Sequence, residues 1–215
     1  MTTMLSGAQR RAVSRLATLG TVTVVAGVVG AASAVTIIAW PDEVADRRYS
    51  YPFGATSYVV AQLFFALQHL GLLAGLYGLT RLVWPRVGRP TRSGLVLSLL
   101  GMVGLTACEV FALSATDALV DTARANAVDN SYGAPLIAIG LGMVAAGTGL
   151  ARRSMLPGGG RRLVLVMGVY VFVVMFPAVF GPLAAGRIAV GVWMLMFAAL
   201  GIVLVRADRN GGLTQ

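Results

Sequence analysis

Six long apolar runs, separated by shorter polar stretches, make up most of this 215-residue chain. A run of about 20 apolar residues is long enough to cross the hydrocarbon core of a bilayer as a helix. The predicted membrane-spanning helices cover about residues 17–40, 58–80, 94–116, 134–151, 163–180 and 187–205. The pattern therefore predicts an all-α protein, a polytopic membrane helical bundle with six transmembrane helices in one domain over residues 1–215.

Two stretches of this pattern have a second interpretation. The small residues at 31–34 are compatible with signal-peptide cleavage, but the apolar run continues to Trp40 and is longer than a usual signal-peptide core. We therefore expect this run to be retained as the first span. The polar stretch 117–133 is expected to be an outer loop, with room for a short surface helix.

Composition agrees with a membrane location and predicts an orientation. Hydrophobic residues make up 57% of the chain and charged residues 12%, about half the charged share of a soluble domain. Every basic residue is arginine, and 13 of the 17 arginines fall in the N-terminal stretch, the second and fourth loops and the C-terminal tail. Because positive charge stays on the cytoplasmic side, we predict a multi-pass plasma-membrane protein with both termini in the cytoplasm. The basic charge thus serves topology in the lipid bilayer and gives no reason to expect nucleic-acid binding.

Rare and absent residue types exclude several kinds of chemistry. Without lysine, the chain cannot form a Schiff base with retinal or pyridoxal phosphate. Its one cysteine, Cys108, and one histidine, His69, are too few for an internal disulfide, a CxxC site or a multi-histidine metal site. The chain has no Asp-rich diphosphate motif, which argues against a prenyltransferase that binds Mg-diphosphate. We therefore expect no metal and no cofactor.

One carboxylate lies inside the third predicted span. Glu109 occurs in GMVGLTACEVFALSATD, about eight residues below the outer end of that span. A charged side chain costs several kcal/mol in hydrocarbon, so an acid at this depth usually faces a bundle interior and has a function. A carboxyl group among apolar groups favours its neutral form, which is a good proton donor. The alternative is a structural Glu that joins helices through a hydrogen bond.

Helical spacing indicates which side chains accompany Glu109. Thr106 and Asp117 lie on roughly the same side of the span and form part of a broken polar line toward the outer surface. In the second span, Gln62 and His69 are seven residues apart and therefore share one face. If these consecutive antiparallel spans are neighbours, Glu109 lies between the heights of Gln62 and His69 and can contact either. For His69, the alternative is a polar side chain satisfied between helices.

Aromatic residues and glycines inside the spans are interpreted first as packing. Single rings are more often core or lipid-facing bulk, although several rings around an acid would form a cavity able to stabilise a carbocation. The GxxxG of Gly71 and Gly75 favours close helix packing within one bundle, and it also permits a homo-oligomer. The GxGxxA of residues 140–145 lies inside a span with no preceding strand, so it is likewise interpreted as packing.

In its length, helix number, arginine-only composition and the intramembrane acid of TACEVFALSATD, the chain resembles the small bacterial integral-membrane terpene cyclases of indole-terpenoid and drimane-type pathways. The resemblance is one of type across the whole chain. It implies an enzyme that protonates an alkene or epoxide of a lipophilic isoprenoid substrate and holds the resulting cations between aromatic walls. Glu109 would then be the proton donor, and Asp117 or His69 would tune or reload it. The residues that this resemblance places around the substrate are Gln62, Phe65, Phe111, Tyr170 and Trp193.

A second class of function uses the same residues. A buried Glu near a His also suits proton-coupled transport, so the alternative is a non-enzymatic small membrane protein, either a transporter subunit or a partner of another membrane protein. An enzyme should show a closed cavity with Glu109 on its wall, and a transporter should show a water path to that residue. A protein that only binds a partner should hold Glu109 between helices without a cavity.

Overall fold

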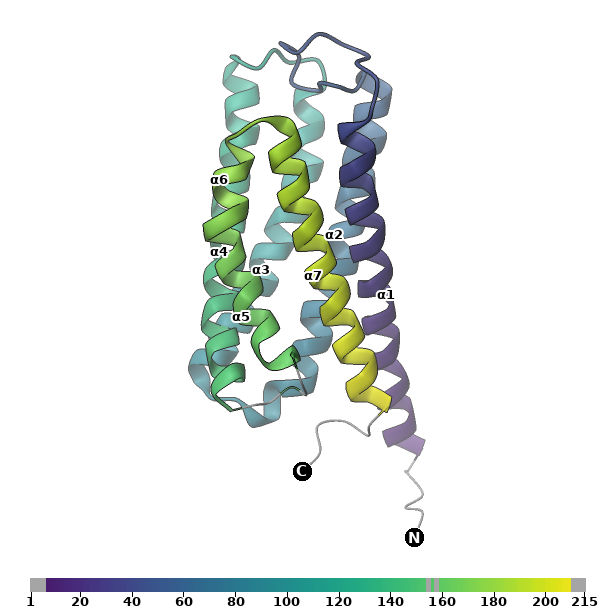
Figure 1. Ribbon diagram of the computed structural model, residues 1–215, viewed down its shortest axis with the longest axis vertical. Coiled ribbons are helices and arrows are strands. Elements are labelled where there is room, and N and C mark those ends of the chain that lie inside the picture. Colours follow the sequence, from purple (N-terminus) through teal and green to yellow (C-terminus); the bar gives the residue numbers. More distant parts are fainter. Residues whose placement is uncertain (1–6, 154–155, 157–158, 210–215) are drawn as a thin grey trace.

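The molecule is a bundle of helices that stand side by side (Figure 1). The structure is a computed structural model, and it describes residues 7–153, 156 and 159–209. Within these ranges, six helical segments are long and apolar enough to cross a membrane, which confirms the predicted all-α bundle. These segments are Arg15–Ile38, Ala55–Arg86, Arg89–Ala115, Ala123–Arg152, Gly160–Val179 and Leu183–Arg209.

Most spans are single helices, and the fifth is composite. The single helices are α1 (Gly7–Ile38), α2 (Ala55–Val83), α3 (Arg89–Ala112), α4 (Ala123–Arg152) and α7 (Leu183–Arg209). The fifth span consists of α5 (Gly160–Tyr170), the π-helical segment Val171–Met175 and α6 (Phe176–Val179). The π-helical turn comes directly before Pro177, whose ring disfavours a regular α-helix in the preceding turn. The proline therefore alters the helix here.

The fourth span begins earlier than the sequence predicts. The expected loop up to residue 133 is wrong, because α4 starts at Ala123. The Thr122 hydroxyl caps the helix by accepting a hydrogen bond from the Ala125 N–H at 3.3 Å. Arg124 and Asp129 make the first turns polar, so hydropathy alone assigns them to a loop although the helix is continuous. The short surface helix allowed by the sequence is thus the first part of α4.

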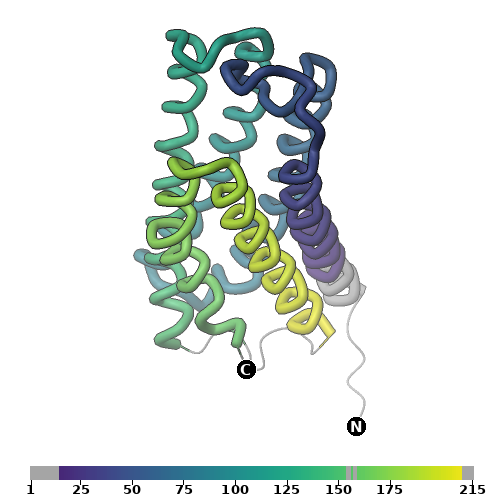
Figure 2. The backbone as a smooth tube through the Cα atoms, turned by 45° about the horizontal axis from the view of Figure 1, so that its top comes forward, coloured from purple at the N-terminus to yellow at the C-terminus, as the bar shows by residue number. Residues whose placement is uncertain are grey.

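The upper end of the bundle is closed by loops and not by the last two spans. The turn between α6 and α7 lies below the upper ends of α2, α3 and α4 in both views (Figures 1 and 2). Two loops, residues 39–54 and 113–122, lie above the turn between α6 and α7. Backbone hydrogen bonds of 3.0 Å join them, from the Tyr49 N–H to the Ala118 oxygen and from the Val120 N–H to the Arg47 oxygen. These loops therefore form one connected cover.

The first of these loops is organised around Glu43. Its carboxylate accepts hydrogen bonds from the Gly54 N–H at 2.7 Å, the Trp40 Nε1 at 2.8 Å and the Ser57 hydroxyl at 2.8 Å. These bonds, that of Gly54 foremost, hold the pKa of Glu43 below its ordinary value of 4.5. One charged residue thus ties the end of α1 to the start of α2.

Small residues let the helices approach closely. A Cβ atom on Gly71 would lie 2.5 Å from the Cβ of Ala26, and one on Gly75 would lie 2.5 Å from the Cγ2 of Thr23. Both glycines therefore face α1 of the same chain, which confirms the packing interpretation of the GxxxG. The glycines within 140–142 also pack against neighbouring helices, so the GxGxxA is confirmed as a packing motif.

Candidate functional site

The outer half of α2 presents polar side chains to the bundle. Tyr58, Gln62, Phe65 and His69 recur at helical intervals, so they share one side of the helix. His69 is buried, with 5% of its surface exposed. The small Ala66 beside it is buried as well, which lets a neighbouring helix approach at this level.

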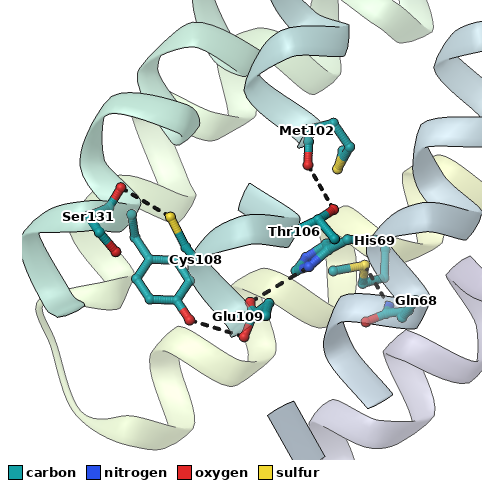
Figure 3. A network of polar contacts seen from close by, with 9 residues as sticks. Gln68, His69, Met102, Thr106, Cys108, Glu109 and Ser131 are labelled. Atoms are coloured by element: carbon teal, nitrogen blue, oxygen red, sulfur yellow. Dashed lines mark hydrogen bonds and ion pairs between the residues drawn. The ribbon is translucent and has the colours of Figure 1, made fainter. Parts of the chain in front are cut away.

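Glu109 meets this side of α2 from α3 (Figure 3). The Glu109 side chain is buried, and its Oε1 lies 3.6 Å from the Nδ1 of His69. The second and third spans are therefore neighbours, as expected. Of the two contacts that the sequence left open for Glu109, with Gln62 or with His69, the structure shows the one with His69. At 3.6 Å the two groups interact electrostatically when charged, but this separation is too long for a hydrogen bond. Direct proton transfer between them would require a closer approach.

Tyr132 holds the other oxygen of Glu109. The Tyr132 hydroxyl donates a hydrogen bond to Glu109 Oε2 at 3.0 Å. Sequence reasoning misses this residue because it assigns residues 117–133 to a loop, whereas the early start of α4 carries Tyr132 into the bundle. The signal that could have found it is the helical cap at Thr122, which starts the helix before the apolar run.

Arg187 brings a positive charge to the same place. It lies one turn into α7, and its guanidinium carbon is 5.7 Å from the centre of the Phe65 ring. It is half-buried and interacts electrostatically with Glu109, Tyr132 and Tyr58. The sequence prediction assigns Arg187 to the edge of the last loop, so this residue is not among the predicted site residues. We call His69, Glu109, Tyr132 and Arg187 the polar centre.

Asp117 and Phe111 lie outside this centre. The sequence prediction ends the third span at about residue 116 and places Asp117, at the start of the loop, on the side of Glu109. In the structure α3 ends at Ala112, and the chain turns through the 3-10 segment Leu113–Ala115. Asp117 is therefore exposed in the outer loop, where its backbone oxygen accepts a hydrogen bond from Arg48 at 3.3 Å. Phe111 is 45% exposed on the outside of the bundle. The predictions that Phe111 lines the substrate cavity and that Asp117 lies beside Glu109 are therefore wrong.

Three further residues have defined surroundings. Tyr170 donates a hydrogen bond to the Ala189 oxygen at 3.0 Å and so joins the fifth span to α7. Trp193 is 1% exposed in the core and packs edge-on against Phe197, with ring centres 4.8 Å apart. Cys108 is buried and directs its Sγ toward the Ser131 oxygen at 3.3 Å, away from Glu109 (Figure 3). Tyr170 and Trp193 lie between helices, and their roles as substrate contacts stay predictions.

A cavity of about 330 Å³ lies at the outer loops and not at Glu109. Its walls include Leu113, Asp117 and Arg124. Around Glu109 the helices are closely packed, with partners from α2, α4 and α7. This arrangement matches the one expected of a protein that only binds a partner, whereas the closed cavity with Glu109 on its wall, expected of an enzyme, is not found among the described residues. In the described ranges, no group of three or more His, Cys, Asp or Glu side chains is placed to hold a metal ion.

The polar groups near this centre are not all satisfied. Among the described residues, three buried side-chain atoms have no hydrogen-bond partner. They are the Gln62 Oε1, the His69 Nδ1 and the Trp193 Nε1. Native proteins leave few such atoms, and each one calls for an explanation.

Comparison of the chain with protein-family models, with curated proteins and with solved structures found no significant match.

Proposed function

We propose that this chain is an integral membrane enzyme that cyclises a lipophilic isoprenoid by protonation from Glu109. The observation that supports this most is the setting of that carboxyl group. It is buried in the apolar bundle, one oxygen is held by Tyr132, and the other faces His69 at 3.6 Å without a hydrogen bond. An acid in this setting is oriented, shielded from bulk water and provided with a second titratable group.

The proposed reaction conserves protons. The proton on Glu109 adds to one carbon of an alkene, whose π electrons form the new C–H bond, while the O–H electron pair remains on the carboxylate. The other alkene carbon becomes a cation, and a second π bond of the same chain attacks it to close the ring. The final cation loses a proton to the Glu109 carboxylate, which restores the acid for the next cycle. If His69 accepts that proton first, the proton has to pass on to Glu109 before the acid is restored.

The other members of the polar centre stabilise the carboxylate that is left after transfer. A hydrogen bond to a charged acceptor is roughly twice as strong as one to a neutral acceptor, so the Tyr132 bond strengthens as the proton leaves. The positive charge of Arg187 favours the same charged form. The Phe65 ring of α2 lies near that guanidinium, with 5.7 Å between the ring centre and the guanidinium carbon.

Incubation of membranes that contain the chain with farnesylated aromatic substrates in D₂O tests the proposal. We expect a cyclised product that carries one deuterium at the protonated carbon. Glu109→Gln should abolish the product while expression and helix content stay unchanged. Full product formation by Glu109→Gln would refute the role of the acid.

Proton-coupled transport is the second candidate, because the same Glu–His contact suits it. Proteoliposomes with an enclosed pH dye separate the two functions. A transporter moves protons across the vesicle wall when substrate is added and forms no new compound. The enzyme forms product in detergent, where no gradient exists.

We also propose that the chain lies in the plasma membrane with both termini in the cytoplasm. The first residues of α1 and the last of α7 lie at the same end of the bundle (Figure 1). That end also carries Arg86, Arg92 and Arg153, whereas Glu43 and Asp117 lie in the loops at the other end. Reporter fusions after residue 209 and within 113–122 should report opposite sides.

A further inference from the structure

We infer that Arg92 and Arg153, beside Trp84, form a binding site for the headgroup of an anionic phospholipid such as phosphatidylglycerol. The site lies at the end of the bundle where α1 begins and α7 ends (Figure 1). The inference goes beyond the proposed function, because it uses none of the residues of the polar centre. It requires only that the helices cross a bilayer.

Two arginines from different spans are fixed on the turn between α2 and α3, the 3-10 segment Trp84–Arg86. The Arg92 Nε, in the first turn of α3, donates a hydrogen bond to the Trp84 backbone oxygen at 3.2 Å. The Arg153 Nη1, at the C-cap of α4, donates one to the Arg86 backbone oxygen at 3.2 Å. Both guanidinium groups are therefore anchored to the same short segment.

The positive charge of this pair is not neutralised by the protein. No ion pair joins Arg92 or Arg153 to a carboxylate in the part of the chain that the structure describes. Of the eight acids in the sequence, Asp208 is the one at this end of the bundle, and its side chain is buried. Each guanidinium group has further N–H donors besides the one that its backbone bond uses. These donors remain for a phosphate, which arginine binds well.

A topological role explains the charge but not its arrangement. The positive-inside rule needs arginines near the ends of spans and sets no requirement on their geometry. Here the Arg92 guanidinium carbon also lies 5.2 Å from the centre of the Trp84 ring. The Arg153 Nη2 reaches to Gly88, since a Cβ atom added there would lie 3.9 Å from it. Because both groups are held before a ligand arrives, less side-chain freedom is lost on binding.

The surroundings identify the ligand as a lipid. Trp84 is partly exposed just after α2 ends, and tryptophan at the end of a span lies at the level of the headgroups. Further along the same side of α3 as Arg92, the apolar side chains of Val96, Leu100 and Val103 are exposed. A headgroup at Arg92 therefore leaves its acyl chains along an apolar side of α3. A soluble phosphate ester gains nothing from that side.

Native mass spectrometry of the full chain in detergent tests the site. The chain is titrated with dioleoyl phosphatidylglycerol or dioleoyl phosphatidylcholine, which share their acyl chains and differ in the net charge of the headgroup. An arginine near anionic lipid contributes a roughly fivefold preference, so we expect the pair to bind phosphatidylglycerol about 25-fold more tightly. Equal affinity for the two lipids would overturn the inference.

Two double variants separate the arginine pair from total charge. Arg92→Gln with Arg153→Gln should abolish the preference for phosphatidylglycerol. Arg206→Gln with Arg209→Gln removes the same charge from the last turn of α7, at the same end of the bundle, and should keep the preference. Equal losses in both would show that total charge selects the lipid and would contradict the site.

A single variant makes the test independent of how well the first double variant folds. Arg153→Gln changes one exposed side chain and should reduce the preference roughly fivefold. An unchanged preference would remove Arg153 from the site and refute the pair.

Glycerol phosphate distinguishes a lipid from a soluble phosphate ester. We expect an equal concentration of glycerol phosphate to leave phosphatidylglycerol bound, because it lacks the acyl chains that lie along α3. Displacement at equal concentration would overturn the assignment of the ligand as a lipid.

Discussion

Replacement of Tyr132 by phenylalanine tests the chemistry of the polar centre most directly. The change removes the hydroxyl that donates to Glu109 Oε2 at 3.0 Å and keeps the ring that packs beside the core. A hydrogen bond contributes about 0.5–1.5 kcal/mol to a neutral acceptor and about 1.5–3 kcal/mol to a charged one. The loss specific to the carboxylate formed during proton transfer is therefore about 1–1.5 kcal/mol, which corresponds to a roughly 5- to 12-fold fall in kcat.

The assay is steady-state cyclisation with separate determination of kcat and KM. We expect KM to stay within about twofold, because Tyr132 acts through its hydrogen bond to the acid. Tyr58→Phe is the matched control, since its hydroxyl donates to the Ala112 backbone oxygen at 3.2 Å and not to the acid. An unchanged kcat for Tyr132→Phe, or an equal fall for both variants, would refute the stabilisation of the carboxylate by Tyr132.

Three further predictions concern the acid, the packing and the outer loop. Arg187→Gln should lower kcat on the order of tenfold, because it removes a nearby positive charge that acts at an effective dielectric of about 20. Arg124→Gln, in the outer region, is the control and should leave kcat unchanged. Similar kcat values for the two variants would contradict the role of Arg187. Gly94→Ala places a Cβ 2.7 Å from the backbone of α4 and should cost about 1–3 kcal/mol of stability in a denaturation assay. Gly133→Ala, which has nothing within 4 Å of the added Cβ, should be neutral or stabilising by up to about 1 kcal/mol, so equal losses would refute the packing argument. Glu43→Gln should lower Tm at neutral pH, and the difference from the native chain should shrink below pH 4.5, because the carboxylate form is lost as the pH falls through its lowered pKa. A difference that persists undiminished at about pH 3 would show that charge on Glu43 is irrelevant.

The spans follow from hydropathy because every turn inside a bilayer must be apolar, whereas the ends of the helices do not obey that rule. Apolar periodicity locates α2 and α3 and the level of Glu109 and His69, so their contact is predictable from consecutive antiparallel helices. The polar turns at the start of α4 are helical although they leave the hydrocarbon region. Hydropathy therefore does not predict that Tyr132, just beyond these turns, lies in the helix. The same limit applies at the end of α3, where the 3-10 turn after Ala112 removes Asp117 from the line of Glu109.

Arg187 illustrates a different limit. A cation at the first turn of a span fits a topological explanation, and the sequence contains no local signal that it faces inward. Its position depends on the turn between α6 and α7, which stays below the upper ends of α2, α3 and α4 (Figure 1). The start of α7 therefore lies inside the bundle, where Arg187 interacts electrostatically with Glu109. This is a tertiary property of helix lengths and cannot be read from one span.

The close packing around Glu109 agrees with a structural role, but it does not satisfy all the polar atoms of the polar centre. A Glu kept only to join helices should satisfy its partners, as the Gln68 Nε2 does between α1 and α7. Glu109 uses Oε2 for Tyr132, but its Oε1 stops 3.6 Å short of His69, whose Nδ1 then has no hydrogen-bond partner in the described part of the chain. The unclosed pair, with a cation on one side and an oriented tyrosine on the other, favours a centre that serves a bound molecule over one that serves the fold alone.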